Sequence, residues 1–284
     1  MEVIKAEEMG LCFGVRDALE AAAAVPDPAQ VTIHGELVHN PTVTRRLADA
    51  GFHQSAEHDR VATGDTPMVL ITAHGVSDAE RRRLVDAGRS LIDTTCPLVR
   101  RAHDAARTLA AEGRHILLVG RAGHVEVRGI VEDLSSVDII ASPDDVERYP
   151  HQRLGIISQT TTPPDVLAAV LERVTVLNRE SDIRFMDTVC QPTKARQEAV
   201  RDLLGRVDAV VVVGGRNSNN TQRLVHQCRE RDVRAFHVEG ADDLDPAWFV
   251  GIETVGLTAG TSTLARTIDE VQRALERLPS PAIA

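Results

Sequence analysis

The stretch Ser90–Val99 reads "SLIDTTCPLV": a short apolar run ends in Asp-Thr-Thr-Cys, and a proline stands where a helix would begin. Residues 184–193, "RFMDTVCQPT", repeat this order around Cys190. Cys12, in "GLCFGV", also precedes a helical pattern, and the three cysteines stand at nearly equal intervals. We therefore predict three similar modules, each opening with a cysteine just before a helix.

Short apolar runs alternate with amphipathic helical patterns along the chain. The runs are apolar throughout, which is typical of parallel strands covered by helices on both faces. The predicted strands are Val31–Ile33, Met68–Ile71, His115–Val119, Leu154–Ile157, Ala209–Val213 and Thr254–Leu257. We predict an α/β fold of three modules with mostly parallel strands, in a pseudo-threefold, trefoil-like arrangement that would gather the cysteines at its centre. The predicted modules are 1–95 with the Cys12 segment, 96–188, and 189–284 with a C-terminal helix and a short tail.

Several helix boundaries follow from capping residues. Ser77 and Glu80 have the spacing of a capping box, and Pro41 and Pro97 suit the first position of a helix. Helix ends are expected at Gly51, Gly88 and Gly113. The last helix is predicted from one apolar face, made of Leu264, Ile268, Val271, Leu275 and Leu278.

Composition narrows the class of protein. Aromatic residues make up 2% of the chain and the net charge is −10, which argues against binding of nucleic acid. No apolar run is as long as a membrane span, and the N-terminus lacks the basic-then-apolar order of a signal peptide. With 4 widely spaced cysteines we expect a cytoplasmic protein with no membrane partner and no disulfide scaffold.

Loops rich in hydrogen-bond donors follow all the predicted strands. Ligands bind beyond the carboxyl ends of parallel strands, where helix N-termini also point. The His, Asn, Ser, Thr and Gly residues of these loops suit a diphosphate, although any one such loop is more often a helix cap. The nucleotide-binding patterns of a P-loop or G-x-G-x-x-G do not occur. The loops are 34–40, 73–76, 120–127, 158–162, 214–220 and 258–263.

The cysteines fit more than one role. Three buried thiols acting as small apolar residues are one alternative. A zinc site would need paired ligands at short spacing, and the chain has no C-x-x-C. Separated cysteines before helix N-termini suit an iron–sulfur cluster, and three ligands would leave one iron open for catalysis. Cys228 stands outside the repeat and is predicted to pack in the core.

Glu126 is a carboxyl group in a loop otherwise rich in donors. Near a bound anion it would hold a proton more readily, which makes it a candidate proton donor. An ordinary surface glutamate is the alternative.

Nine motifs in order, over nearly the whole chain, resemble the 4-hydroxy-3-methylbut-2-enyl diphosphate reductases, the LytB/IspH family. The motifs are "GLCFGV", "ELVHNPTV", "AHGVS", "DTTCPLV", "GHVEV", "SQTT", "DTVCQPTKARQEAV", "VVGGRNSNNTQRL" and "TAGTST". The resemblance implies three α/β lobes around a [4Fe–4S] cluster held by Cys12, Cys96 and Cys190, with one iron open to substrate. It implies an oxidoreductase of the non-mevalonate isoprenoid pathway that removes an allylic hydroxyl group with two electrons and two protons. The products would be isopentenyl and dimethylallyl diphosphate, and a ferredoxin or flavodoxin would donate the electrons.

The same resemblance implies the roles of individual residues. Glu126 would relay protons, with His124 and Thr160 beside it, and Thr160 would contact the hydroxyl end of the substrate. The substrate-binding residues would be His39, His74, His124, Thr160, Ser218, Asn219, Asn220 and Ser262. The chain departs from the usual family pattern at Val125, Asn219, Thr261 and Leu264. Two alternatives stay open: a divergent paralogue reducing another hydroxylated substrate, and a non-catalytic anion-binding α/β protein with structural thiols.

Overall fold

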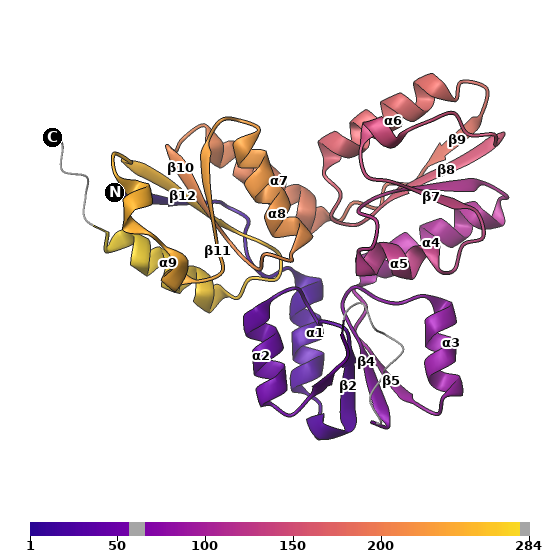
Figure 1. Cartoon of the computed structure of the whole chain (residues 1–284), viewed down its shortest axis with the longest axis horizontal. Coiled ribbons are helices and arrows are strands. Elements are labelled where there is room, and N and C mark those ends of the chain that lie inside the picture. Colours follow the sequence, from indigo (N-terminus) through magenta and orange to yellow (C-terminus); the bar gives the residue numbers. More distant parts are fainter. Residues whose placement is uncertain (57–65, 279–284) are drawn as a thin grey trace. The chain divides into compact units, whose positions relative to one another are not determined.

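The computed structural model describes residues 1–56 and 66–278 (Figure 1). The chain divides into two compact units. Unit 1 comprises Met1–Phe13, His39–Thr42 and Gln191–Ala284, and unit 2 comprises Gly14–Val38 and Val43–Cys190. Unit 2 contains two parallel four-stranded sheets and unit 1 contains one. The predicted α/β fold is confirmed, while the module boundaries and the threefold arrangement stay predictions. The end of the predicted tail, residues 279–284, lies outside the described residues.

The first sheet of unit 2 has the strand order β3-β2-β4-β5. Its strands are β2 (Val31–His34), β3 (His53–Gln54), β4 (Met68–Ile71) and β5 (Ser90–Asp93). The helices of this part of the chain are α1 (Phe13–Ala23), α2 (Pro41–Asp49) and α3 (Asp78–Asp86). The side chain of Ser77 accepts the Glu80 N–H at the start of α3, which confirms the predicted cap.

The second sheet of unit 2 has the order β7-β6-β8-β9. Its strands are β6 (His115–Val119), β7 (Val137–Ile140), β8 (Arg153–Ser158) and β9 (Asp182–Phe185). Its helices are α4 (Pro97–Ala111), α5 (Val125–Val131) and α6 (Pro164–Leu177). Helix α4 begins at Pro97 and α2 at Pro41, as predicted.

The sheet of unit 1 has the order β1-β12-β10-β11. Its strands are β1 (Glu2–Lys5), β10 (Ala209–Val213), β11 (Arg234–Val238) and β12 (Thr254–Ala259), with helices α7 (Gln191–Leu204), α8 (Asn219–Arg229) and α9 (Ala265–Glu276). Short 3-10 turns complete the chain at Pro28–Gln30, Pro143–Asp145, Ala241–Asp243 and Pro246–Phe249. Strand β1 comes from the start of the chain and pairs in parallel with β12.

All three sheets share one strand order. In each of them two adjacent central strands are followed by donor-rich loops, and one edge strand precedes a cysteine. The edge strands before the cysteines are β1, β5 and β9, which lie next to β12, β4 and β8. The repeat expected from the sequence is therefore a repeat of topology, in which the N-terminal strand completes the C-terminal sheet.

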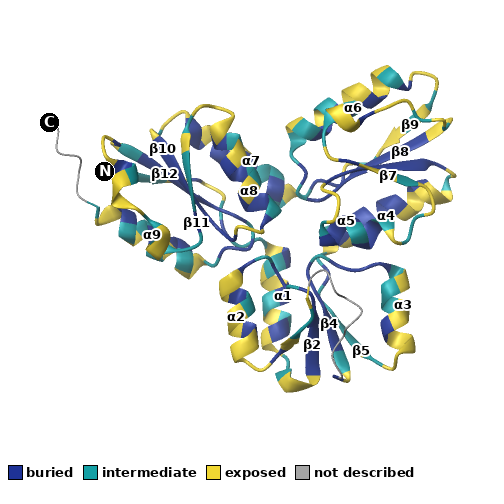
Figure 2. Cartoon of the chain, viewed as in Figure 1, coloured by how far each residue is buried: buried dark blue, intermediate teal, exposed yellow. Residues whose placement is uncertain are grey.

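The central strands are buried on both faces, as Figure 2 shows in dark blue. In β10, Val211 and Val213 pack in one apolar cluster with residues of α9, while Val210 and Val212 pack in another with residues of α7 and α8. Each such side chain contributes roughly 1.5–3 kcal/mol through burial. This two-sided burial explains the unbroken apolar runs.

All the predicted strands are present, extended by up to two residues. The predicted helix-end glycines Gly51, Gly88 and Gly113 have positive φ, which confirms them as C-terminal caps. The predicted apolar face of α9 is buried at Ile268, Val271 and Leu275. Within residues 1–56 and 66–278, no helix has the length and apolar character needed to cross a membrane.

Candidate functional site

The three repeated cysteines share one backbone arrangement. Each of them directly precedes the first residue of a helix, α1, α4 or α7. The N–H of each cysteine donates to the carbonyl group two residues beyond the end of the neighbouring strand. These bonds are Cys12 to Thr261 at 3.1 Å, Cys96 to Ala73 at 3.1 Å and Cys190 to Thr160 at 2.9 Å. Each thiol is thereby set at a helix N-terminus, where a thiolate is stabilised.

The two Asp-Thr-x-Cys motifs form the same turn. The Asp93 carboxylate accepts the Thr95 N–H at 3.0 Å, and the Asp187 carboxylate accepts the Val189 N–H at 3.1 Å. The following threonines donate their hydroxyl groups to the last carbonyl of the neighbouring strand. These bonds are Thr94 to Ile71 and Thr188 to Ser158, both at 2.6 Å. The repeated Asp-Thr-x-Cys motif thus forms the same turn at both positions, and each turn presents a cysteine.

All three cysteines lie outside disulfides and are partly exposed, as a ligating thiol requires. Gly14, on the first turn of α1, leaves space for Cys96: a Cβ on this glycine would lie 2.4 Å from the Cys96 Sγ. Cys12 belongs to unit 1, whereas Cys96 and Cys190 belong to unit 2. Within either unit, the described residues contain no group of three His, Cys, Asp or Glu side chains placed to hold a metal ion. Cys228 is fully buried among Leu224 and Val225, which confirms its predicted packing role.

The candidate acid Glu126 is not a surface residue. It lies in the first turn of α5 and is 2% exposed. Its carboxylate accepts the Thr160 N–H at 2.6 Å and the Thr160 hydroxyl at 3.0 Å. Because the Thr160 carbonyl also accepts the Cys190 N–H, one residue connects the carboxyl group to the second cysteine turn.

Two histidines of unit 2 lie close to this carboxyl group. His124 caps α5, and its Nδ1 accepts the Glu126 N–H at 3.2 Å, so the ring hydrogen lies on Nε2. The rings of His74 and His124 contact each other edge to face, with centroids 5.8 Å apart. The structure therefore brings together His74, His124, Glu126 and Thr160 within unit 2.

In unit 1, the start of α8 presents donors for an anion. Ser218 caps the helix by accepting the Thr221 N–H at 3.3 Å, which leaves its own hydroxyl hydrogen for a ligand. Asn220 is 2% exposed; its Oδ1 accepts the Thr261 N–H at 3.0 Å, while its buried Nδ2 has no hydrogen-bond partner in the described residues. An orphaned buried amide at a helix N-terminus fits an anionic ligand such as a diphosphate.

The segment His39–Thr42 belongs to unit 1 and packs against the last donor loop. The Ser262 hydroxyl donates to the His39 carbonyl at 3.2 Å, and the Asn40 amide donates to the Ser262 carbonyl at 2.6 Å. A Cβ on Gly215 would lie 2.7 Å from the same His39 carbonyl, so this close approach requires glycine. His39, Ser218, Asn219, Asn220 and Ser262 therefore all lie in or beside loops of one unit.

The departures from the family pattern fit the local structure. Val125 occupies the first position of α5 and is buried, and Glu126 keeps its contacts to Thr160. Thr261 uses both backbone groups: its carbonyl accepts the Cys12 N–H, and its N–H donates to the Asn220 Oδ1. Leu264 stands directly before α9. None of these changes removes a predicted ligand or acid.

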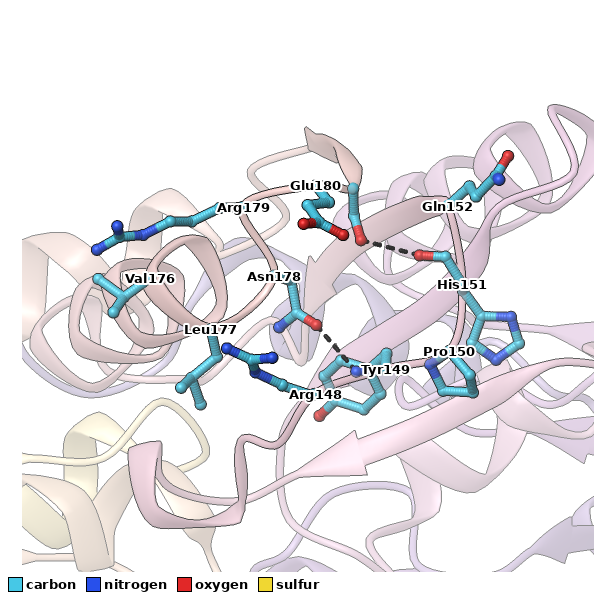
Figure 3. A pocket seen from close by; sticks show the side chains of 11 residues that line it. Arg148, Tyr149, Pro150, His151, Gln152, Val176, Leu177, Asn178, Arg179 and Glu180 are labelled. Carbon is cyan, nitrogen blue, oxygen red and sulfur yellow. Dashed lines mark hydrogen bonds between the residues drawn. The ribbon is translucent and has the colours of Figure 1, made fainter.

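A cavity near the second sheet of unit 2 is not part of this site. It measures about 630 Å³ and lies between segments 148–152 and 176–181 (Figure 3). Both segments precede the strands β8 and β9, so the cavity lies at the amino ends of the strands. None of the predicted site residues lines it.

Sequence reasoning missed several residues that shape the site. Gly14 makes room for Cys96, Asn40 holds the Ser262 loop, and Arg196 donates to the carbonyl of Gly10 beside the Cys12 segment. The signals were present: a glycine two residues after a cysteine, and an asparagine before a helix-starting proline. A partner far along the chain could not be assigned from those signals.

These features define a class of protein: an α/β protein of three parallel sheets whose strand ends carry three thiols, anion donors and one buried carboxyl group. The model of the LytB protein family matches residues 3–276, and the chain belongs to this family. This confirms the resemblance inferred from the motifs.

Known relatives agree over nearly their full length. The chain is 40% identical to a 4-hydroxy-3-methylbut-2-enyl diphosphate reductase of Geobacter sp. (strain M21), covering 95% of both chains. It is 33% identical to the enzyme of the same name from Aquifex aeolicus, covering 98% of this chain and 97% of that one. The solved structure of the E-1-hydroxy-2-methyl-but-2-enyl-4-diphosphate reductase from Plasmodium falciparum matches with a TM-score of 0.90 at 25% identity, over 98% of this chain and 89% of that one.

Proposed function

We propose that this chain reduces 4-hydroxy-3-methylbut-2-enyl diphosphate, removing its allylic hydroxyl group as water and releasing isopentenyl and dimethylallyl diphosphate. Family membership and the names of the relatives support this function. The observation that carries it is the buried Glu126–Thr160 pair, joined through the Thr160 carbonyl to the turn that presents Cys190. The chain retains all the predicted thiols and the predicted acid.

Cys12, Cys96 and Cys190 would hold a [4Fe–4S] cluster as thiolates. Their shared turn geometry, their partly exposed thiols outside disulfides and the space left by Gly14 fit this role. The cluster would supply electrons singly and a Lewis-acidic iron. A ferredoxin or flavodoxin of the cytoplasm would supply electrons to the protein.

The donor loops would bind the diphosphate and fix its orientation. Ser218, the Asn220 Nδ2 and the N-terminus of α8 would bind phosphate oxygens, together with His39, Asn219 and Ser262 of the same unit. His124 would donate through Nε2, with His74 beside it. Binding of the diphosphate end fixes the position of the hydroxyl end of the substrate. This orientation lowers the activation barrier of the reaction.

Glu126 would supply protons. Hydroxide is a poor leaving group, so the departing oxygen needs a proton from a nearby acid. Glu126 is buried, and the two bonds from Thr160 fix the orientation of its carboxyl oxygens. The Thr160 hydroxyl would contact the hydroxyl end of the substrate. A proton added at either end of the allylic system gives the two products.

An anaerobic turnover assay tests this function. The protein, loaded with iron and sulfide, is given 4-hydroxy-3-methylbut-2-enyl diphosphate and a strong artificial reductant, and the products are identified by mass spectrometry. We expect both five-carbon diphosphates. An iron-containing protein that changes colour on reduction but does not consume this substrate would favour a paralogue with another substrate. Protein that binds no iron under cluster-assembly conditions would favour a non-catalytic anion-binding protein.

A further inference from the structure

Arg196, on helix α7 of unit 1, is a buried cation. It is 4% exposed and stands six residues after Cys190 in the chain. Its Nε and Nη2 donate to the Gly10 carbonyl at 3.1 and 2.7 Å, and its Nη1 donates to the Pro192 carbonyl at 3.0 Å. Gly10 lies two residues before Cys12. The guanidinium therefore connects α7, the helix that follows Cys190, to the segment that carries Cys12.

All acceptors on Arg196 are neutral. Over residues 1–56 and 66–278, no carboxylate lies within 4.0 Å of its guanidinium. Arg114 provides a contrast: it is also buried, at 8% exposure, but pairs with Glu112 and Asp182 at 2.8 Å each. A buried charge is costly unless an opposite charge offsets it, so Arg196 calls for an anion that the protein's own carboxylates do not provide.

Arg196 makes one of several contacts that fix the Cys12 segment. The Gly10 N–H donates to the Ala259 carbonyl at 3.1 Å, and the Cys12 N–H donates to the Thr261 carbonyl at 3.1 Å. Gly10 has φ of 72°, and a Cβ there would lie 2.8 Å from Ile268 Cδ1. The Gly10 carbonyl thus points to Arg196 from a backbone conformation that only glycine adopts readily.

We propose that Arg196 is a positioning residue for Cys12 and the charge partner of the thiolate-bound iron–sulfur cluster. Its fork holds the Gly10 carbonyl, and its cation offsets negative charge carried by the cysteine thiolates. This inference rests on the proposed function, since it assumes that these thiols bind a cluster. The bidentate bond from Arg196 to Gly10, in the segment that carries Cys12, favours the cluster over the diphosphate as its anion.

Arg196 should influence the reduction of the cluster. Reducing the cluster adds negative charge, which a buried cation stabilises. Removing the cation should therefore shift the midpoint potential to a more negative value. Removing only the bidentate hydrogen bonds to Gly10, while keeping the positive charge, should loosen Cys12 and leave the midpoint potential nearly unchanged.

Three variants separate charge from positioning. Arg196→Met removes the charge and the fork, whereas Arg196→Lys keeps the charge and loses the bidentate geometry. Arg201→Met removes an exposed arginine from the same helix and serves as the matched control. Each protein is purified anaerobically, and two quantities are measured: the midpoint from a redox titration followed by visible absorbance, and the rate of iron release to a chelator.

In Arg196→Met we expect a more negative midpoint and about tenfold faster iron release, the factor that a charge-assisted hydrogen bond typically represents. In Arg196→Lys the midpoint should stay close to that of the unmodified protein while iron release rises. Arg201→Met should match the unmodified protein in both quantities. Equal midpoints in Arg196→Met and Arg201→Met would overturn the proposal, and so would a midpoint in Arg196→Lys as negative as in Arg196→Met.

A thermal measurement covers the case in which Arg196→Met folds poorly. The rise in Tm from cluster-free to cluster-loaded protein should be smaller in Arg196→Met than in the unmodified protein, because the cluster relieves a buried charge only in the latter. An equal rise in both would contradict the proposal. Weaker binding of inorganic diphosphate with an unchanged midpoint would also contradict it, by assigning the anion to the substrate. Failure of the unmodified protein to bind iron would instead disprove the proposed function.

Discussion

The two Asp-Thr-x-Cys turns of unit 2 have the same backbone and different surroundings. In both, the aspartate caps the turn, the threonine bonds the end of the neighbouring strand, and the cysteine N–H bonds the loop beyond it. The differences lie in the side chains that contact these groups. The repeat therefore reproduces ligand geometry, and each copy has acquired its own connections.

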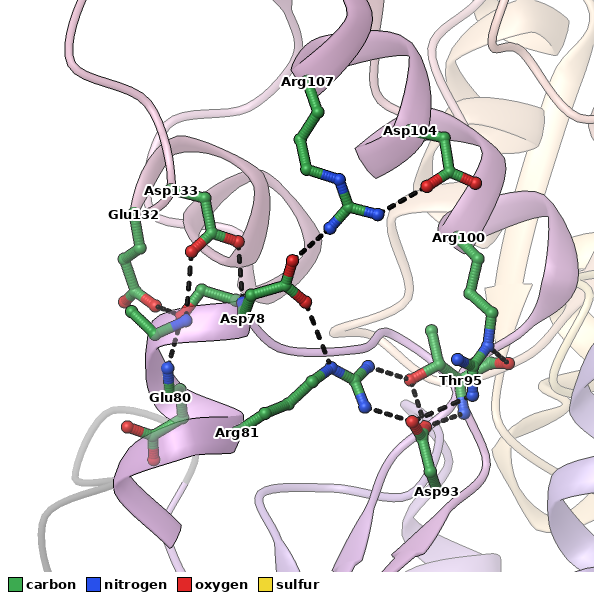
Figure 4. A network of polar contacts seen from close by, with 12 residues as sticks. Asp78, Glu80, Arg81, Asp93, Thr95, Arg100, Asp104, Arg107, Glu132 and Asp133 are labelled. Atoms are coloured by element: carbon green, nitrogen blue, oxygen red, sulfur yellow. Dashed lines mark hydrogen bonds and ion pairs between the residues drawn. The ribbon is translucent and has the colours of Figure 1, made fainter. Parts of the chain in front are cut away.

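The first turn is held by an ion network (Figure 4). Asp93 pairs with Arg81 of α3 and, at 2.9 Å, with Arg100 of α4. The Thr95 hydroxyl donates to Asp93 at 2.6 Å and accepts from Arg81 at 3.0 Å. Burial alone would raise the pKa of Asp93, but the bonds from Thr95 and the pairing with Arg81 lower it below its ordinary value.

The second turn is connected to the candidate acid instead. Asp187 is exposed, and Arg101 bonds its carbonyl group rather than its carboxylate. The Cys190 N–H meets Thr160, whose own N–H and hydroxyl meet Glu126. The difference teaches that one cysteine turn is stabilised by charge pairs, while the other is hydrogen-bonded through Thr160 to the buried carboxyl group of Glu126.

The largest expected effect comes from removing the cysteine that each of the two turns presents. Cys96→Ser and Cys190→Ser should each abolish stable cluster binding and turnover, because a hydroxyl group at pH 7 does not replace a thiolate ligand. Iron content and visible absorbance measure this. Cys228→Ser is the control, since Cys228 is buried in an apolar cluster and burial raises its pKa to about 12. Iron retained in Cys96→Ser would exclude that residue as a ligand.

The next effect tests the coupling of the second turn to the acid. Glu126→Gln keeps the shape and removes the proton supply, so turnover should fall by roughly 10²–10⁴-fold, the usual contribution of an acid catalyst. Binding of inorganic diphosphate should be nearly unchanged. Glu132→Gln, six residues after Glu126 and directly after the last residue of α5, serves as the control. Full turnover in Glu126→Gln would show that protons come from elsewhere.

The sequence predicted the central strands because those strands are buried on both faces. The edge strands were harder: β9 reads Asp-Ile-Arg-Phe and is mostly exposed, so it carries no apolar run. The pairing of β1 with β12 joins the two ends of the chain, and no local pattern specifies such a partner. Periodicity thus reports burial, while strand order depends on contacts between distant segments.

The candidate site also contains residues that were predictable from the sequence and residues that were not. The donor loops and cysteines were predictable because their chemistry is visible in residue type and in position after a strand. The roles of Gly14 and Arg196 were not predictable, since a glycine that admits a sulfur atom and an arginine that bonds a distant carbonyl look ordinary in sequence. Their functions exist only in the tertiary structure.

A pH-dependent effect should distinguish the surroundings of the first turn. His103 of α4 lines a cavity of about 260 Å³ together with Arg81 and Thr95. Burial lowers its pKa from 6.5 to about 4, opposed by Asp133 and reinforced by Arg107. The unfolded chain therefore binds the proton more readily between these values, and stability should fall as the pH drops from 6.5 to 4, by roughly 3 kcal/mol in total.

Urea unfolding at several pH values measures this dependence. In His103→Leu the part due to this residue should disappear, so its stability curve should be flatter between pH 6.5 and 4. His226→Gln, which changes an exposed histidine of α8, should keep the original slope. A slope unchanged in His103→Leu would show that other groups cause the acid sensitivity.

The smallest expected effect compares the two aspartates directly. Asp93→Ala removes the acceptor for Thr95 and leaves Arg81 and Arg100 without their shared carboxylate, so it should cost about 2–3 kcal/mol of unfolding free energy. Asp187→Ala removes the capping bond to Val189 from an exposed carboxylate, and about 1 kcal/mol is expected. Urea unfolding of both variants at pH 7 measures the difference. Equal costs would mean that the arginines around the first turn add nothing to its stability. A larger cost in Asp187→Ala would mean that coupling to Thr160, rather than charge pairing, governs how firmly a cysteine turn is held.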